Sequence, residues 1–522
     1  MKQPLLRSLF LSSFLFGAVT CYAQSKNYNV KDFGAAGDGK TIDTQPINKA
    51  IDAAAAAGGG TVYFPAGTYT SYSIHLKSNI SLYIDQGATI LGAEGDQYDP
   101  AEPNEMADKL KYQDFGHSHW HNSLIWGENL ENISIMGPGT IYGKGLTRES
   151  RRNGQGNKAI SLKLCRNVIL KDFTILYGGH FGMLLTGVDN MTIDNIKEDT
   201  NRDGMDIDCC RNVHVSNCSV NSPWDDGICL KSSYALGYAR VEEDITITNC
   251  QVSGFDRGTF INGTFMHNET KMVPDRQGPT GRIKFGTESN GGYKNVAITN
   301  CTFQNCRGLA LETVDGAQLE DVTISNITMR DIFNSPIFLR LGARMRGPAG
   351  VDTGNLRRIT ISNINVYNAD SHFASMIVGI PGHPIENVQL NNIHIYYRQI
   401  DSPLVKIQKN VAEYVHDYPE PQRFGVNPAY GFFIRHAKNI EMNNVEISFM
   451  GKETRPAVIL EDVQGIYLNN FKAQTPEGMP MIIQRGVTGL NIFPERSIAS
   501  NKIKKEQVPV TIPDPPARRG QQ

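Results

Sequence analysis

Three carboxylic acids stand in two short clusters that lie one repeat apart in the chain. Asp203 belongs to the Asn-Arg-Asp-Gly segment at 201–204, and Asp225 and Asp226 belong to the Trp-Asp-Asp-Gly segment at 224–227. Asp225 follows Asp203 by 22 residues. If each repeat is one coil of a solenoid, the carboxyl groups converge within roughly 5 to 9 Å of one another. Crowded carboxyl groups are costly unless their charge is used, so this spacing is the strongest indication of function.

Hydrolysis of a glycosidic bond is the chemistry that such a group of acids can perform. One carboxylic acid must protonate the leaving oxygen, and one carboxylate must activate a water molecule. The alternative is a structural role, because Asp before Gly is common in turns. Two such clusters one coil apart favour catalysis over turns.

The elements that must position these acids come from a repeated phrase. Its pattern is Asn, aliphatic, any, aliphatic, any, Asn or Asp, apolar, and it occurs at 167–173, 190–196 and 212–218, with looser copies up to 465–471. Each copy alternates apolar and polar residues, which indicates a short strand with one buried face. We expect the Asn positions to stack their amides at turns, where Asn tolerates left-handed backbone.

Successive copies lie 22 to 52 residues apart, which favours a solenoid of short strands. A β-propeller is the rival architecture, but it needs a blade period of about 40 residues or more. The sequence therefore predicts an all-β, right-handed parallel β-helix that forms one catalytic domain over residues 24–500. An Ala-rich helix over 47–57 and a strand over 61–64 are expected to cap its N-terminal end.

The two ends of the chain carry different signals. Lys2 and Arg7 precede an apolar run at 9–19 and small residues at 21–23, which predicts a signal peptide over 1–23 and export to the periplasm or the medium. A lipoprotein site at Cys21 is the alternative for this segment. The polar, basic and Pro-rich stretch at 501–522 predicts a flexible tail.

Composition narrows the choice of partners. A net charge of −2 without a Lys/Arg block argues against a nucleic-acid partner, and no later segment has transmembrane length, so no membrane contact is expected after signal cleavage. Cys218, Cys250 and Cys301 share one inward slot of the repeat, so we expect buried apolar cysteines rather than disulfides. No Cys/His spacing suggests zinc, and we expect a monomer with no cofactor and no metal.

The acidic segments resemble a known enzyme family. The segment Asn-Arg-Asp-Gly-Met-Asp at 201–206 resembles the Asn-Thr-Asp-Gly-Ile-Asp motif of the family 28 glycoside hydrolases, the polygalacturonases and their relatives. The segment Asp-Asp-Gly-Ile-Cys-Leu-Lys-Ser at 225–232 is similar to that family's Asp-Asp-x-Ile-x-Ile-Lys-Ser motif. The resemblance extends over about residues 28–450.

This resemblance implies an exported, inverting hydrolase that acts on galacturonosyl linkages of a pectic polysaccharide or oligosaccharide. By position, Asp225 is the general acid, while Asp203 and Asp226 hold and deprotonate the attacking water. Lys231 is implied as a substrate-binding residue.

Two motifs depart from the family pattern. The family's Gly-His-Gly is replaced by Thr-Gly-Arg at 280–282, and its Arg-Ile-Lys is replaced by Ala-Leu-Glu at 310–312. Strand alternation turns Arg282 and Lys284 outward, so we hypothesise that they bind a substrate carboxylate in place of the missing cations. A solvated charged pair is the alternative. Glu312 adds a negative charge and either pairs with a neighbouring cation or binds sugar hydroxyls.

Further residues are candidates for the same cleft. His180 lies one coil before Asp203 and is expected to line the cleft in place of the absent family His. Arg340 faces outward by strand alternation and is expected to contact a uronate. His117, His119 and His121 are open between cleft lining, a metal site and simple alternation.

Long gaps between the repeats, at about 254–281 and 401–432, are expected to hold loops that close the cleft into a pocket for exo-action. The altered cations keep rhamnogalacturonan open as a substrate. Two other classes are a calcium-dependent lyase, against which the paired Asp motifs argue, and a non-catalytic glycan-binding β-helix.

Overall fold

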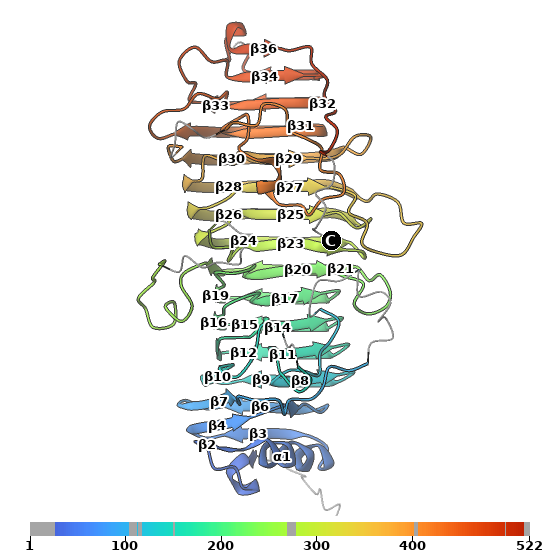
Figure 1. Cartoon of the computed structure of the whole chain (residues 1–522), viewed down its shortest axis with the longest axis vertical. Helices are drawn as coiled ribbons and strands as arrows, with labels where there is room; N and C mark the ends of the chain where they lie inside the picture. Colours follow the sequence, from blue (N-terminus) through green and yellow to red (C-terminus); the bar gives the residue numbers. More distant parts are fainter. Residues whose placement is uncertain are drawn as a thin grey trace, which may run out of the picture.

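The computed structural model describes residues 27–103, 112, 117–149, 152–268, 278–400, 406–495 and 497–515. The predicted signal peptide at 1–23 lies outside these ranges. Within them, short strands pair in parallel with the equivalent strands of neighbouring coils and form one long stack (Figure 1). The parallel β-helix predicted from the repeated phrase is therefore confirmed.

The coils build three parallel sheets that run the length of the stack. The first sheet contains β1 (Asn27–Asn29), β3 (Gly60–Phe64), β6 (Ile80–Ile84), β9 (Glu131–Met136), β12 (Arg166–Lys171), β15 (Asp189–Asp194), β18 (Arg211–Ser216) and β21 (Glu242–Thr248). The second sheet contains β2 (Asp38–Ile42), β4 (Gly67–Ser71), β7 (Ala88–Gly92), β10 (Thr140–Tyr142), β13 (Thr174–Leu176), β16 (Lys197–Asp199), β19 (Ser219–Asn221) and β22 (Gln251–Ser253).

Longer strands join the first two sheets in the later coils. They are β24 (Tyr293–Cys306), β26 (Gln318–Ile332), β28 (Asn355–Ala369), β30 (Ile385–Tyr397) and β31 (Phe432–Phe449). In the last coils β32 (Val458–Asn469) and β35 (Thr488–Phe493) continue the first sheet, and β33 (Lys472–Ala473) continues the second. The first residues of β31 and β32 also belong to the third sheet.

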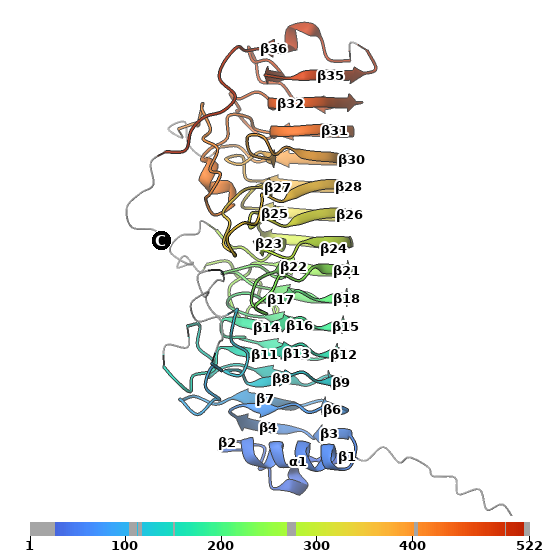
Figure 2. The same cartoon turned by 90° about the vertical axis from the view of Figure 1, so that its right-hand side faces the viewer.

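The third sheet is the one that positions the acids. It contains β5 (Ile74–His75), β8 (Ile125–Glu128), β11 (Lys158–Lys163), β14 (Phe181–Thr186), β17 (Met205–Asp208), β20 (Ile228–Ser232), β23 (Ile283–Ser289), β25 (Leu309–Thr313), β27 (Ile337–Leu341), β29 (Ser375–Val378), β34 (Ile482–Arg485) and β36 (Ile503–Lys505). Figure 2 shows the loops gathered along the side of the stack that carries β14, β17, β23 and β27.

Asn residues set the bends between the sheets. Asn132, Asn167, Asn190 and Asn212 all have left-handed backbone, with φ of 54–57°. Each amide donates to the amide oxygen of the preceding coil, as in Asn190 to Asn167 at 3.1 Å and Asn212 to Asn190 at 2.9 Å. Asn adopts this conformation at lower cost than most residues, and the amide ladder keeps successive bends in register.

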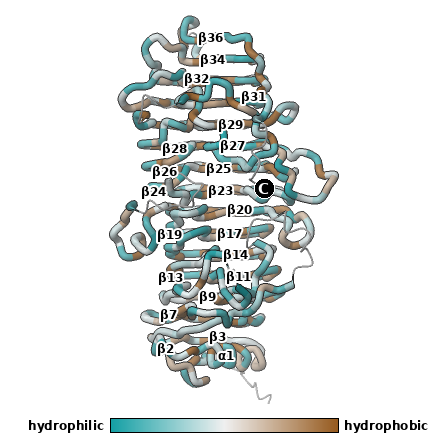
Figure 3. Tube along the Cα trace, in the orientation of Figure 1, coloured by the Kyte–Doolittle hydropathy of each residue, from teal (hydrophilic) through white to brown (hydrophobic). Residues whose placement is uncertain are grey.

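The interior of the stack is filled by aliphatic side chains from the alternating positions. Val168, Met191, Val213 and Ile245 occupy one register position in β12, β15, β18 and β21, and all are at most 1% exposed. The alternation of apolar and polar residues can be followed along the strands in Figure 3. Cys218, Cys250 and Cys301 are buried and unpaired, as predicted, and so are the other cysteines in the described part of the chain.

The N-terminal end of the stack is covered by α1 (Thr44–Ala56), which buries Ile47, Ala50, Ile51 and Ala54. A short 3-10 helix, η1 (Val30–Phe33), packs against it. The predicted cap is present, although the helix begins three residues earlier than expected. None of the helices in the described ranges combines the length and apolar character needed to cross a membrane.

Residues 501–515 form ordered structure, in contrast to the flexible tail that the sequence predicted. After η4 (Ser500–Lys502), β36 pairs with β34 and adds a strand to the third sheet. Asp514 then accepts hydrogen bonds from the backbone N–H groups of Tyr414 and Val415, so the chain returns to the 406–430 loop. Polar composition suggested disorder, but main-chain pairing and one carboxylate fix this segment. Residues 516–522 lie outside the described ranges.

The Asn ladder gives a test of what holds the coils together. Replacing Asn212 by Ala removes the amide bond and places a less tolerant residue at φ 54°. We expect the free energy of unfolding to fall by about 1–2 kcal/mol in urea titrations. The matched Asn212→Gly variant keeps the backbone conformation accessible and loses less. Equal losses in the two variants would mean that backbone conformation contributes nothing at this bend.

Candidate active site

The acidic clusters occupy the turns that lead into two adjacent strands of the third sheet. Asp203 lies two residues before β17, and Asp226 lies two residues before β20. Because Met205 pairs with Ile228, Asp203 and Asp226 stand at the same position of successive coils. One carboxyl oxygen of each of the three acids, Asp225 included, lies within 4.8 Å of the others. The three acids therefore lie close together, as their spacing in the sequence predicted.

The glycines after these acids allow the turns to approach closely. A Cβ atom on Gly204 would lie 2.4 Å from the carbonyl oxygen of Gly227 on the next coil. This contact leaves no room for a side chain, so the Asp-Gly pairs serve the packing of the turns as well as their conformation. The three acids are only 2–4% exposed as a result of this close packing and of the loops above them.

Arg202 places a guanidinium between two of the acids. Its Nη1 lies 2.5 Å from Oδ2 of Asp203, and its Nη2 lies 3.0 Å from Oδ2 of Asp225. The guanidinium also packs near the ring of Phe181. Sequence reasoning missed this role, although the residue stands in the acidic motif where the resembling family has Thr.

The third acid is paired with Arg282 and Lys284, the two cations hypothesised to bind a substrate carboxylate. Nε of Arg282 lies 2.9 Å from Oδ1 of Asp226, and Nζ of Lys284 lies 3.4 Å from Oδ2 of Asp226. Glu312 contacts both cations, at 3.8 Å from Arg282 and 3.4 Å from Lys284. Arg282 and Lys284 are 1% and 2% exposed, so they are buried partners of the acids rather than a solvated charged pair.

The loop at 406–430 closes over this group of charges. Glu420 accepts from Arg282 at 2.7 Å and pairs with Arg307 at 3.1 Å. The Tyr418 hydroxyl lies 3.4 Å from Nζ of Lys284. The short helix η3 (Pro421–Phe424) follows, and its orange ribbon lies beside β27 in Figure 2. The second long gap in the repeats is therefore a cover for the acid cluster.

Arg340 does not join the acids, and its predicted contact with a uronate is corrected by the structure. Its guanidinium donates to the carbonyl oxygens of Gly379, Glu413 and Tyr414 at 3.2, 2.9 and 2.7 Å. It also packs on the ring of Phe424, and it is only 1% exposed. Strand alternation placed Arg340 on the correct face, but the loop covers that face, and Arg340 anchors the loop.

His180 lies under Arg202. Its Nδ1 is 2.7 Å from the carbonyl oxygen of Arg148, so this nitrogen carries the proton and donates it. Nε2 then accepts from Nη1 of Arg202. Burial and the charge of Arg202 lower the pKa of His180 well below its ordinary value, so the imidazole is neutral. His180 belongs to the site as predicted by its spacing, but it touches the acids through Arg202.

Lys231 lies in a buried ionic chain beside the acids. Its ammonium is 3.5 Å from Asp206 and 3.2 Å from Glu288, and Asp206 is 2.7 Å from Nε2 of His117. The predicted substrate contact at Lys231 is thus a contact with two acids, and the residue is 5% exposed.

The three histidines before the repeats separate in the structure. His117 reaches the ionic chain of Lys231, whereas His121 pairs with Glu128 at 2.9 Å and stacks on Trp126. Burial lowers the pKa of His119. The three histidines therefore do not line one common surface, because His117 and His121 contact different groups of residues.

Burial dominates the protonation of two acids in the site. It raises the pKa of Asp203 to about 8, against the opposing charge of Arg202. Burial also raises the pKa of Glu312 to about 7, although Lys284 and Arg282 oppose it. Two carboxyl groups of the site therefore keep protons near neutral pH even though cations contact them.

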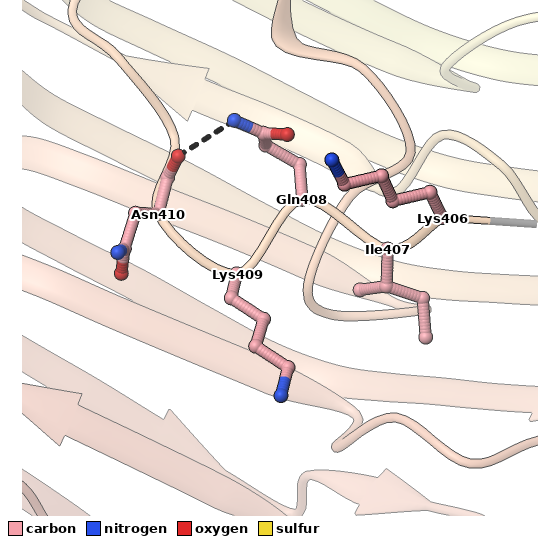
Figure 4. Close-up of a pocket in the computed structure, with 5 residues that line it drawn as sticks. All are labelled: Lys406, Ile407, Gln408, Lys409 and Asn410. Carbon is pink, nitrogen blue, oxygen red and sulfur yellow. Dashed lines mark hydrogen bonds between the residues drawn. The ribbon is translucent and has the colours of Figure 1, made fainter.

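A separate hollow lies on the same loop. Figure 4 shows its lining, Lys406 to Asn410, in which the Gln408 amide donates to the carbonyl oxygen of Asn410 at 2.8 Å. None of the acids described above lines it.

Comparisons with known proteins identify a family and several relatives. A family model for rhamnogalacturonase A/epimerase, pectate lyase-like proteins matches residues 27–372. A probable polygalacturonase of Vitis vinifera is 24% identical over 392 residues, which cover 69% of this chain and 77% of that protein. An exo-poly-alpha-D-galacturonosidase of Dickeya chrysanthemi is 26% identical over 213 residues, which cover 40% of this chain and 34% of that protein.

A solved structure shares the fold. The family 28 exopolygalacturonase of Yersinia enterocolitica matches with a TM-score of 0.62 at 19% identity, over 86% of this chain and 79% of that one. This likeness confirms the right-handed parallel β-helix that the repeats predict.

The raised pKa of Asp203 predicts a cost in stability. The folded protein holds this proton up to about pH 8, whereas an unfolded Asp loses it near its ordinary 3.8. Stability contributed by this residue therefore falls as the pH rises between these values. An Asn side chain at this position carries no charge, so we expect Asp203→Asn to gain up to about 4 kcal/mol relative to wild type between pH 5 and pH 8.

Urea unfolding at the two pH values measures this difference. Asp352→Asn, at an exposed position, is the matched control and should follow wild type. Parallel pH dependences for wild type and Asp203→Asn would contradict the buried, proton-holding carboxyl.

Proposed function

Because the chain belongs to the rhamnogalacturonase A/epimerase, pectate lyase-like family, we propose that it is a glycoside hydrolase that cleaves galacturonosyl linkages of pectic glycans. The observation that carries this proposal is the cluster of Asp203, Asp225 and Asp226, whose carboxyl oxygens lie within 4.8 Å of one another. The names of the polygalacturonase and exo-galacturonosidase relatives support the substrate class.

The three acids divide the chemistry between them. Asp225 protonates the oxygen of the leaving sugar, while Asp203 and Asp226 hold the water and take its proton. Inversion is proposed from the family resemblance. The spacing alone does not support it, because inverting pairs usually stand about 6.5–9.5 Å apart and these acids stand closer.

The charges around the cluster favour a hydrolase over a calcium-dependent lyase. Three carboxylates at these distances resemble a cation site, but the protein's own Arg202, Arg282 and Lys284 contact them. A calcium ion would compete with these side chains for the same oxygens. A non-catalytic glycan-binding protein would gain nothing from three buried acids in one site, which are costly to hold.

The covering loop supports an exo mode of action. Glu420 and Tyr418 stand on Arg282 and Lys284, immediately beside Asp226. Such a cover would block the passage of a long chain through the site, which favours cleavage at a chain end. Rhamnogalacturonan is the alternative substrate, and the description of the matching family model favours keeping it in the assay.

Export and a monomeric state complete the proposal. Export rests on the segment at 1–23, which has the charged, apolar and small-residue parts of a signal peptide. The monomeric state is carried over from the sequence as an expectation. Secretion is tested by N-terminal sequencing of the mature protein recovered from outside the cytoplasm.

The general acid gives the direct test of catalysis. Asp225→Asn keeps the shape of the site and removes the proton donor, so kcat on oligogalacturonides should fall by about 100- to 10,000-fold. Reducing-sugar release measures it, and Asp352→Asn is the control. An Asp225→Asn variant with unchanged activity would contradict the assigned role, and an unsaturated, ultraviolet-absorbing product would indicate a lyase.

The mode of action is tested by product size. Early in the digestion of polygalacturonate and of rhamnogalacturonan fragments, we expect only the shortest product, released from a chain end. Chromatography of the first products makes the measurement. An early ladder of mid-sized oligomers would contradict the closed pocket, and activity on rhamnogalacturonan alone would reassign the substrate.

A further inference from the structure

Arg202 favours the ionised form of Asp225, whereas the role assigned to Asp225 requires the protonated form. Its Nη2 lies 3.0 Å from Oδ2 of Asp225, and a cation at this distance favours the ionised carboxylate. A general acid must carry a proton when it meets the leaving oxygen. The observed arrangement is therefore a resting state, and the contact between Arg202 and Asp225 must be exchanged before the glycosidic bond is protonated.

Arg202 is also the cation of the cluster that a ligand reaches most readily. Its side chain is 13% exposed, against 1% for Arg282 and 3% for Lys284. Arg282 and Lys284 are bound by Asp226, Glu312 and Glu420 together. A substrate carboxylate that enters the site therefore meets the guanidinium of Arg202 before the deeper cations.

Two further contacts hold Arg202 in position when its ion pair with Asp225 is broken. Nη1 binds Oδ2 of Asp203 at 2.5 Å and donates to Nε2 of His180. The neutral His180 is itself fixed by its hydrogen bond to the carbonyl oxygen of Arg148. The Nη1 side of the guanidinium is thus anchored, and the Nη2 side faces the exchangeable carboxylate.

We propose that Arg202 makes hydrolysis depend on the carboxylate of the substrate: the carboxylate of a sugar beside the scissile bond takes the place of Asp225 on Arg202 and so frees Asp225 to act as the acid. This inference rests on the proposed function and deepens it. A neutral sugar offers no anion for the exchange, so Asp225 stays paired and ionised. Selection for uronic acids then occurs in the acid step as well as in binding.

The proton that Asp225 needs is supplied by Asp203. Burial raises the pKa of Asp203 to about 8 although Arg202 opposes it, and the charges of Asp225 and Asp206 raise it further. In the proposed resting state the pair of acids therefore shares one proton, which Asp203 holds, and Asp225 is the carboxylate paired with Arg202. After the exchange, the proton passes from Asp203 to Asp225 through the water that the acids hold, since one water can bridge carboxyl oxygens that lie within 4.8 Å of one another. Asp203 is then the ionised base, still held by Arg202, and Asp225 is the protonated acid.

In the reaction itself, Asp225 gives this proton to the leaving oxygen as the glycosidic bond breaks. Asp203 accepts a proton from the attacking water, which forms the new bond to the anomeric carbon. Besides Arg202 and the two acids, the charged groups that face this exchange are Asp226, Asp206 and Lys231. The cycle ends with the resting distribution of protons, so no further reactant is needed.

The test compares one trisaccharide in two forms. Trigalacturonate carries carboxylates, and the same trisaccharide with its carboxylates reduced to hydroxymethyl groups is neutral. We expect wild type to prefer the charged form in kcat/KM, and Arg202→Thr, which restores the residue of the resembling motif, to reduce this preference by about 10- to 100-fold. Most of the change should appear in kcat, and the pH profile of the variant should shift.

Arg202→Gln is the second variant, and Arg211→Thr is the matched control, because Arg211 pairs with Glu243 on the first sheet, away from the acids. Circular dichroism checks the folding of each variant. A wild-type enzyme that cleaves both forms equally, or variants that lose both activities in equal proportion, would overturn the inference. A wild-type protein that cleaves neither polygalacturonate nor rhamnogalacturonan fragments would instead overturn the proposed function.

Discussion

The pairing of buried carboxyl groups with cations from other coils is the interaction on which the site depends. Burying an unpaired charge costs several kcal/mol or more, so a wall with Asp203, Asp225, Asp226 and Glu312 exists only if partners stand beside them. Arg202, Arg282 and Lys284 supply this compensation. Arg202 reaches Asp225 on the next coil, and Lys284 reaches Asp226 and Glu312 on the coils before and after its own. The register of the coils is therefore an electrostatic requirement as well as a packing one.

The same pairing joins the cover of the site to its chemistry. Glu420 comes from the 406–430 loop and binds both Arg282 and Arg307, while Arg340 holds the loop through carbonyl oxygens. An open loop would leave two buried guanidinium groups without this acid. Closure of the loop and neutralisation of the cluster are therefore one event, and the loop is part of the wall that holds the acids.

Much of this structure could be predicted from the sequence, because period-two alternation and the Asn positions are local signals. They indicated the strands, the bends and the meeting of the acids, since residues one coil apart must stack. Arg282 and Lys284 were placed near the acids by the same reasoning. The contacts of Arg340 and Lys231 could not be predicted, because they depend on a loop and on acids far along the chain. Arg202 stood in the motif, but only geometry shows which acids its guanidinium bridges.

The most direct measurement of the account follows the anomer formed first when oligogalacturonide is cleaved. Proton NMR of the fresh digest distinguishes the two anomers before they interconvert. The account predicts that an α-linked substrate yields the β anomer first, since in the inverting reaction that the family resemblance implies, water held by Asp203 and Asp226 attacks from the side opposite to the leaving sugar. The α anomer as first product would contradict it, because one of the acids would then act as a nucleophile.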